Sequence, residues 1–256
     1  MMGFRVLLLK EIREQVRTAR LVAVSVVFIV FGILGPVTDR YMKELIDAVG
    51  AQSGGFSVQI PPPTLEGALV QITKNLSQFG IICALLLAMG SVAWEKERGT
   101  AGMILTKPAS RAAFLAAKLV AISFTLAVAM ALGTGVAYVY TWILYPTVFP
   151  LGGYIAMAVL MWWILVGFTA ITLLGSTITR SAIAAAGIGL VLLVVMGIVG
   201  ALPVVGPYMP SSLSEPARAI GLGQDPGWLI GPLAFNIVLV PVLFTVTWLV
   251  FRRQEL

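Results

Sequence analysis

Charged residues and helix-breaking residues gather in one segment between two apolar runs of the chain. The segment reads Trp94-Glu95-Lys96-Glu97-Arg98-Gly99-Thr100 and continues, after a short apolar stretch, with Lys107-Pro108-Ala109-Ser110-Arg111 and Lys118. Two carboxylates this close together can recognise a basic groove on a partner protein through charge-assisted hydrogen bonds. Charges beside a membrane helix are also common, so composition alone favours a solvated loop.

The same segment has the residues that can begin and end a short helix. Gly99 permits an abrupt change of backbone direction, and Thr100 can cap a helix that runs from about Ala101 to Leu105. Pro108 would end that helix, and Ser110 is placed to cap the next one. These features predict a rigid lever next to the two carboxylates.

Enzymatic chemistry has few residues available in this chain. The 256 residues include no His, which removes the usual general base, the Ser-His-Asp and Cys-His arrangements and the HExxH zinc site. Cys83 is the only cysteine and lies in an apolar run, so we expect a packed side chain. No Gly-Lys dipeptide occurs, so the GxxxxGK(S/T) phosphate loop of ATPases is absent. We predict a non-catalytic chain that itself binds no cofactor and no metal.

The composition indicates that most of the chain lies in a membrane. Hydrophobic residues make up 59% of the sequence and charged residues only 11%, and the mean hydropathy is +0.99. Six apolar runs are long enough to cross a bilayer, at about residues 21–37, 74–93, 119–141, 151–177, 181–202 and 229–250. The sequence therefore predicts an all-α integral membrane protein with one transmembrane domain over residues 1–256.

A helix before the first span and another before the last span are expected outside the membrane core. Residues 1–20 predict an amphipathic interfacial helix, with Leu8, Ile12, Val16 and Ala19 on an apolar face and Lys10, Arg13, Glu14 and Arg17 opposite. Anionic lipid and a partner protein are both suitable surfaces for such a helix. Ser212-Leu213-Ser214-Glu215 fits a capping box, which predicts a short outer helix, interfacial or re-entrant, before the last span.

Proline and glycine predict where the first helices end. Gly35-Pro36 is expected to kink the first span near its outer end, and a separate short helix is expected to end at Gly50. If Glu95 marks the cytoplasmic boundary of the second span, about 20 residues at 1.5 Å each put its outer boundary near Lys74.

The distribution of basic residues predicts the orientation of the chain. Of the 17 Lys and Arg residues, only Arg40, Lys43, Lys74 and Arg218 fall on the proposed outer side, and the other thirteen fall on the inner side. Basic residues favour the cytoplasmic side of a membrane, and an even number of spans returns the chain to the side where it began. We therefore expect a multi-pass protein of the plasma membrane with both termini in the cytoplasm. The basic residues lie in short clusters, which indicates contact with lipid headgroups and not with nucleic acid.

The charged segment resembles the permease subunits of type-2 ABC exporters. In that family the second and third spans are joined by an acidic-x-acidic-x-Gly-Thr element and then a Pro-x-Ser-Arg turn. The matching residues here are Glu95, Glu97, Gly99, Thr100, Pro108, Ser110, Arg111 and Lys118. Many relatives have an acidic residue two places after the Thr, where this chain has Gly102. The interfacial helix, the six spans and the segment before the last span match the same family.

The resemblance implies a role for this segment. The family's short lever is a cytoplasmic coupling helix that docks into a separate ABC ATPase subunit, which binds ATP and Mg²⁺. Glu95, Glu97, Gly99, Thr100, Pro108 and Arg111 are the implied ATPase-coupling residues. Two permeases and two ATPases form the unit in this family, and the second permease is either identical or a paralogue. The resemblance therefore implies an exporter permease that couples to ATP hydrolysis in another chain.

Other classes of function remain open at this point. An ion-coupled secondary transporter could alternate access without an ATPase, although no Asp, Glu or His lies within the predicted spans to carry protons. An intramembrane enzyme lacks the carboxylates and His that its chemistry needs at membrane depth. A membrane assembly protein without transport activity is a further alternative. Apolar walls favour a lipid, a drug-like molecule or an amphipathic peptide as substrate, and the sequence does not identify it.

Overall fold

The computed structural model of the chain describes residues 2–50, 62–100, 110–179, 181–227 and 229–254. Within these ranges the protein is helical and contains no strand. The long helices are α1 (Met2–Arg17), α2 (Arg20–Gly50), α3 (Leu65–Glu97), α5 (Arg111–Leu144), α6 (Leu151–Ile178), α7 (Ala182–Gly200) and α9 (Ile230–Arg252). Between the last two lie the short helices η1 (Gly206–Tyr208), η2 (Pro210–Leu213) and α8 (Ser214–Gly221).

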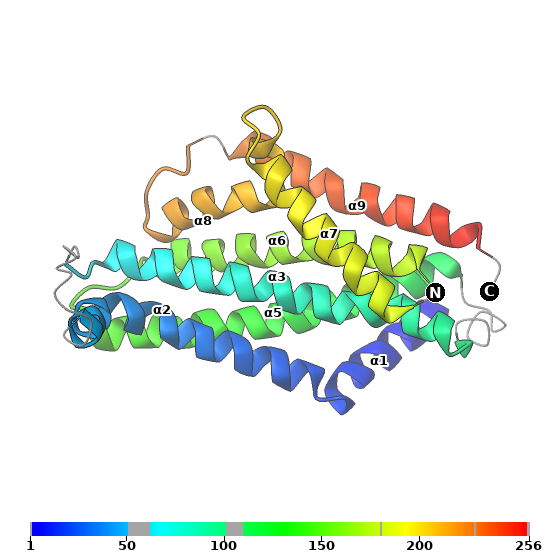
Figure 1. The fold of residues 1–256 in the computed structure, drawn as a ribbon, viewed down its shortest axis with the longest axis horizontal. Coiled ribbons are helices and arrows are strands. Elements are labelled where there is room, and N and C mark those ends of the chain that lie inside the picture. The colour runs from blue at the N-terminus through cyan, green and yellow to red at the C-terminus, as the bar shows by residue number, and fades with distance from the viewer. Residues whose placement is uncertain (1, 51–61, 101–109, 180, 228, 255–256) are drawn as a thin grey trace.

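Four of the helices form the centre of the molecule. Figure 1 shows α2, α3, α5 and α6 running side by side along the long axis, with α7 crossing them obliquely and α9 lying over α6. The main apolar core lies between these four helices and includes Phe28, Leu76, Leu126 and Leu165. Both termini lie at one end of the bundle, where α3 ends and α5 begins. That end therefore brings together segments that are far apart in the sequence.

Six helices are long and apolar enough to cross a membrane, as the sequence predicts: α2, α3, α5, α6, α7 and α9. The candidate spans in α7 and α9 are only 11% buried within the chain, whereas the span in α6 is 67% buried. The apolar surfaces of α7 and α9 therefore face outward along most of their length.

The structure has no separate short helix between the first span and Gly50, and this prediction is wrong. α2 continues through Pro36 to Gly50 as one helix. Tertiary packing accounts for the continuity, because Gly35 lies so close to α3 that a Cβ there would come within 2.9 Å of the Ile72 Cα. Such close packing next to the proline offsets the hydrogen bond that the proline removes.

Two other helix ends also differ from the expected ones. α3 begins at Leu65, ahead of Lys74, and Thr64 caps it by accepting a hydrogen bond from the Gly67 N–H at 3.0 Å. A short helix, α8, precedes the last span, but the predicted capping box is wrong. The Ser212 hydroxyl donates backward to the carbonyls of Pro207 and Met209, both at 2.7 Å, and therefore does not cap α8.

A left-handed residue joins the first two helices. Ala19 has a φ of 54° and separates α1 from α2. This conformation is unfavourable for a residue with a Cβ, and it reverses the local direction of the chain. As a result α1 folds back against α5 and does not extend α2 (Figure 1).

Candidate functional site

Three helices meet through a buried group of charges at the end of the bundle that carries both termini. Lys118, in the first turns of α5, is 2% exposed. Its ammonium donates to Glu11 Oε1 of α1 and to Glu95 Oε1 of α3, both at 3.0 Å. The Lys10 ammonium donates to the same two oxygens, at 2.8 Å to Glu95 and 3.1 Å to Glu11. We call Lys10, Glu11, Glu95 and Lys118 the ion cluster.

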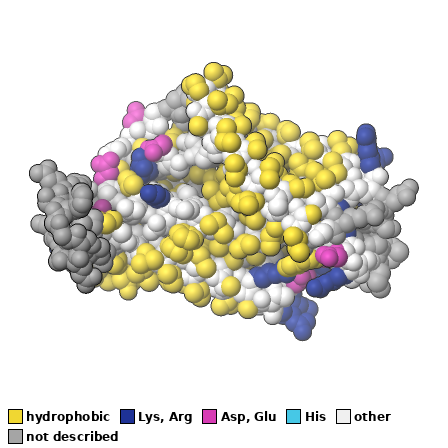
Figure 2. All heavy atoms as spheres, viewed as in Figure 1, with side chains coloured by type: hydrophobic (Ala, Val, Ile, Leu, Met, Phe, Trp, Pro, Cys, Tyr) yellow, Lys and Arg dark blue, Asp and Glu magenta, His cyan; other side chains and the backbone are white. Residues whose placement is uncertain are grey.

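The charges of the ion cluster balance one another. Burying an isolated charge costs several kcal/mol, so each buried carboxylate depends on the ammonium groups beside it. Burial alone would lower the pKa of Lys10, but the hydrogen bond to Glu95 and the charges of Glu11 and Glu95 raise that pKa above its ordinary value. Lys10 therefore stays charged at neutral pH. Figure 2 shows acidic and basic side chains gathered over α1 at this end of the molecule.

The ion cluster is not arranged as a metal site. The carboxylates of Glu11, Glu14 and Glu95 have oxygens within 4.8 Å of one another, a spacing that a divalent cation can bridge. The Lys10 ammonium lies 3.1, 3.7 and 2.8 Å from these three carboxylates, respectively. A lysine side chain thus supplies the positive charge that a metal ion would otherwise supply.

The first helix has a buried polar stripe in addition to its predicted apolar face. Glu11 and Gln15 are only 6% and 4% exposed, while Val16 of the predicted apolar face is 54% exposed within the chain, which leaves it available to lipid. Pairing with Lys118 accounts for the buried stripe, because it draws this side of α1 against α5. The spacing of Glu11 and Gln15, one helical turn apart, is the sequence signal that could have predicted this stripe.

The two predicted recognition carboxylates have different surroundings. The Glu95 side chain is only 14% exposed and is held by the ion cluster. Glu97, at the end of α3, is exposed to solvent. Of the two, Glu97 is therefore the one whose charge a partner can contact directly.

The backbone turns sharply after α3, as predicted. Gly99 has a φ of +69°, in the left-handed region that favours glycine. The Thr100 hydroxyl donates to the Glu95 carbonyl at 3.2 Å and therefore binds back to α3. Pro108 and the expected helix at residues 101–105 lie outside the described residues.

Arg111 and Ser110 hold the beginning of α5. The Arg111 guanidinium donates to the carbonyls of Phe251, Arg252 and Gln254 at 3.0, 2.7 and 3.1 Å, at the C-terminal end of α9. Cations at this end of a helix are favourable, because its last carbonyls carry partial negative charge. The Ser110 hydroxyl accepts from the Ala113 N–H at 3.1 Å, which confirms the predicted cap. Arg111 therefore joins the start of α5 to the end of the last span.

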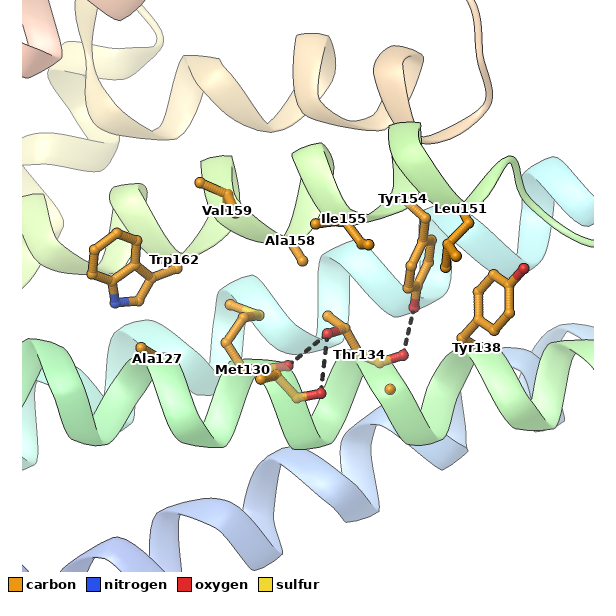
Figure 3. Close-up of a pocket in the computed structure, with 12 residues that line it drawn as sticks. Ala127, Met130, Thr134, Tyr138, Leu151, Tyr154, Ile155, Ala158, Val159 and Trp162 are labelled. Carbon is orange, nitrogen blue, oxygen red and sulfur yellow. Dashed lines mark hydrogen bonds between the residues drawn. The ribbon is translucent and has the colours of Figure 1, made fainter.

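Two cavities lie next to these elements. One, of about 890 Å³, lies beside the ion cluster and is lined by residues of α1, α2, α3 and α5. The other, of about 380 Å³, lies between α5 and α6 (Figure 3). Its lining is mostly apolar, and two polar groups there are hydrogen-bonded to backbone: the Tyr154 hydroxyl of α6 donates to the Thr134 carbonyl of α5 at 2.9 Å, and the Thr134 hydroxyl donates to the Met130 carbonyl at 2.7 Å.

Comparison with known proteins decides the family. A sequence model described as ABC-2 family transporter protein matches residues 5–224, which include most of α1, the ion cluster and Gly99. The chain belongs to the ABC-2 transporter family. It is similar to YxlG of Bacillus subtilis strain 168, an uncharacterised transmembrane protein, with 28% identity over 252 residues and 97% of each chain covered. This ABC-2 family protein is thus a multi-pass membrane protein of a transport system. Such members are in general non-catalytic subunits that act with an ATP-binding partner.

Proposed function

We propose that this chain is the transmembrane permease of an ATP-driven exporter. In this proposal a second permease, identical or paralogous, completes the translocation path, and separate ATPase subunits bind ATP and Mg²⁺. The segment after α3 contacts the ATPase from the cytoplasm, and both termini lie on the same side. Membership of the ABC-2 family supports the general role, and the exposed Glu97 and the turn at Gly99 support the coupling.

The observation that carries the proposal is the position of Glu95. Its carboxylate is paired with Lys118 of α5 and Lys10 of α1, and it lies two residues before the exposed Glu97. A displacement of the end of α3 by a partner is therefore passed through ion pairs to two other helices. A partner that binds Glu97 and shifts the end of α3 would move α1, α3 and α5 together. Alternating access requires a rigid-body motion of this kind.

Neutralising Glu95 and neutralising Glu97 should have different effects on the protein. Glu97→Gln should leave the permease folded but reduce the amount of ATPase subunit that co-purifies, because removing one partner of a desolvated interfacial ion pair typically costs about 2–5 kcal/mol. Glu95→Gln should instead loosen α1 from α5, which is measurable as faster hydrogen exchange in α1.

The experiment compares both variants with Glu44→Gln in lipid nanodiscs with the cognate ATPase. Glu44 is exposed on α2, at the other end of the bundle, and serves as a matched surface control. The measurements are ATPase subunit recovery, substrate-stimulated ATP hydrolysis and hydrogen exchange. Wild-type recovery and hydrolysis in Glu97→Gln would overturn the coupling role. Ion-gradient-driven transport by this chain alone in liposomes would favour a secondary transporter.

A further inference from the structure

Near its C-terminal end, α3 makes backbone hydrogen bonds to a side chain of another helix. The N–H groups of Val92 and Ala93 both donate to the Ser176 hydroxyl of α6, each at 3.1 Å. In an uninterrupted α-helix each N–H donates to the carbonyl four residues earlier, which for Val92 is that of Ala88. The Ala88 carbonyl accepts from the Ser91 hydroxyl at 2.7 Å. A hydroxyl of α6 therefore takes part in the backbone hydrogen bonding of α3.

The residues of this turn also favour bending. Side chains that insert into the backbone hydrogen bonds of a helix and Gly/Ser pairs are two known causes of helix kinks, and Gly90-Ser91 is such a pair. Val92, Ala93 and Ser176 are all 0% exposed, so water does not compete for these hydrogen bonds. We therefore expect residues 88–93 to bend more readily than the rest of α3.

This turn separates two parts of α3 that have different contacts. The part before it packs in the main apolar core. The part after it carries Glu95 of the ion cluster and the exposed Glu97. The Lys96 ammonium donates to the carbonyls of Thr177 and Thr179 at the end of α6, to the latter at 3.3 Å. The long, flexible stem of a lysine allows the end of α3 to turn while it stays attached to α6.

We propose that Ser176 is a positioning residue for energy coupling, about which the end of α3 turns when the ATPase moves the segment after it. This inference rests on the proposed function. The N–H groups of Val92 and Ala93 can bond either to the Ser176 hydroxyl or to carbonyls of their own helix. Both arrangements leave no buried donor of this turn unpaired, so α3 can change between them at little cost. The core part of α3 stays in place during this change.

The test measures the position of the end of α3 in the complex with the cognate ATPase in lipid nanodiscs. Spin labels are placed in a Cys83→Ala background at Arg98 and Arg253, which are exposed at the ends of α3 and α9. Electron–electron double resonance then gives the distance between the labels with and without a non-hydrolysable ATP analogue. We expect the wild type to shift to a new distance when the analogue binds. In Ser176→Ala the population at this distance should fall about tenfold, the size of effect that one or two hydrogen bonds give.

Two further variants make the test specific. Ser91→Ala frees the Ala88 carbonyl for its own helix without changing α6, and it should reduce the shift in the same direction. Thr172→Val is the matched control, because Thr172 lies one turn before Ser176 on α6 and is 4% exposed. Its hydroxyl donates to the Phe168 carbonyl of its own helix at 2.9 Å, so the control should keep the wild-type shift. An unfolding temperature equal to that of the control confirms that each variant is folded.

Recovery of the ATPase subunit separates this inference from the proposed function. Ser176→Ala should keep wild-type recovery, because Glu97 is unchanged. A wild-type distance shift in folded Ser176→Ala, or no shift in the wild type, would overturn the pivot and leave the coupling role in place. A loss of recovery equal to that of Glu97→Gln would show that Ser176 shapes the docking surface and is not a pivot. Failure of the proposed function is seen separately, as wild-type recovery in Glu97→Gln.

Discussion

The Lys118 ammonium lies 3.0 Å from one carboxylate oxygen of Glu11 and 3.0 Å from one of Glu95. One buried cation thus connects α1 to α3 through α5. Its removal would leave two carboxylates close together in a site from which water is largely excluded. The most buried of the ion pairs that join these three helices therefore centre on one side chain.

Lys118→Met should destabilise the protein by about 3–5 kcal/mol, because it leaves buried carboxylates without their main partner. Adding Glu11→Gln should recover part of the loss, since one of the carboxylates is then neutral. Thermal unfolding in nanodiscs measures both effects. Lys10→Met is the control: its side chain is 41% exposed, so the expected loss is only about 1 kcal/mol. Additive effects of the Lys118 and Glu11 changes would contradict the ion cluster.

Gly99→Ala should impose backbone strain without a steric clash. The φ of Gly99 is +69°, and a Cβ there would meet no atom of the described residues within 4 Å. We expect a local cost of about 1–2 kcal/mol, detected as faster hydrogen exchange at the end of α3. Gly99→Asn should cost less, because asparagine adopts the left-handed conformation more readily. Equal exchange in the two variants would show that the φ angle is not the cause.

Gly133→Ala should separate α2 from α5, whereas Gly135→Ala should not. A Cβ at Gly133 would lie 2.7 Å from the Phe28 carbonyl oxygen, and backbone cannot move aside as a side chain can. A Cβ at Gly135 would meet nothing within 4 Å. We expect Gly133→Ala to cost about 1–3 kcal/mol and Gly135→Ala to be neutral or slightly stabilising. Equal unfolding temperatures for the two variants would contradict the close helix approach.

The orientation in the membrane is tested by cysteine labelling in a Cys83→Ala background. Both termini lie at the same end of the bundle, and most basic residues favour the cytoplasm for that end. A cysteine at Gln224 should react with an impermeant reagent in intact cells, and a cysteine at Gln254 should react only after permeabilisation. Labelling of Gln254 in intact cells would reverse the proposed topology.

The sequence predicts the number of spans well because hydropathy acts within each helix. The six spans are recognised by comparing the length of each apolar run with the thickness of the bilayer. That comparison needs no knowledge of which helices pack together. The continuity of α2 through Pro36 was not predictable in this way. It depends on the contact with Ile72 of another helix, and local propensity alone favours a break.

In the candidate site, too, features set by local sequence were predictable and contacts between helices were not. Gly99 and Ser110 were predicted correctly, because a left-handed turn and a helix cap are local features. The difference between Glu95 and Glu97 was not predictable, since it arises from Lys118, a residue on another helix. The buried face of α1 was missed for the same reason.

The position of Glu11 also has a consequence for biosynthesis. Its partner Lys118 is 107 residues further along the chain, so the ribosome completes α1 and two spans before that partner exists. Until then the polar stripe of α1 has no internal counter-charge from α5 and must stay in contact with water at the membrane surface. Docking of α1 therefore follows insertion of the third span, and the N-terminal helix is among the last elements of this half of the protein to reach its final place.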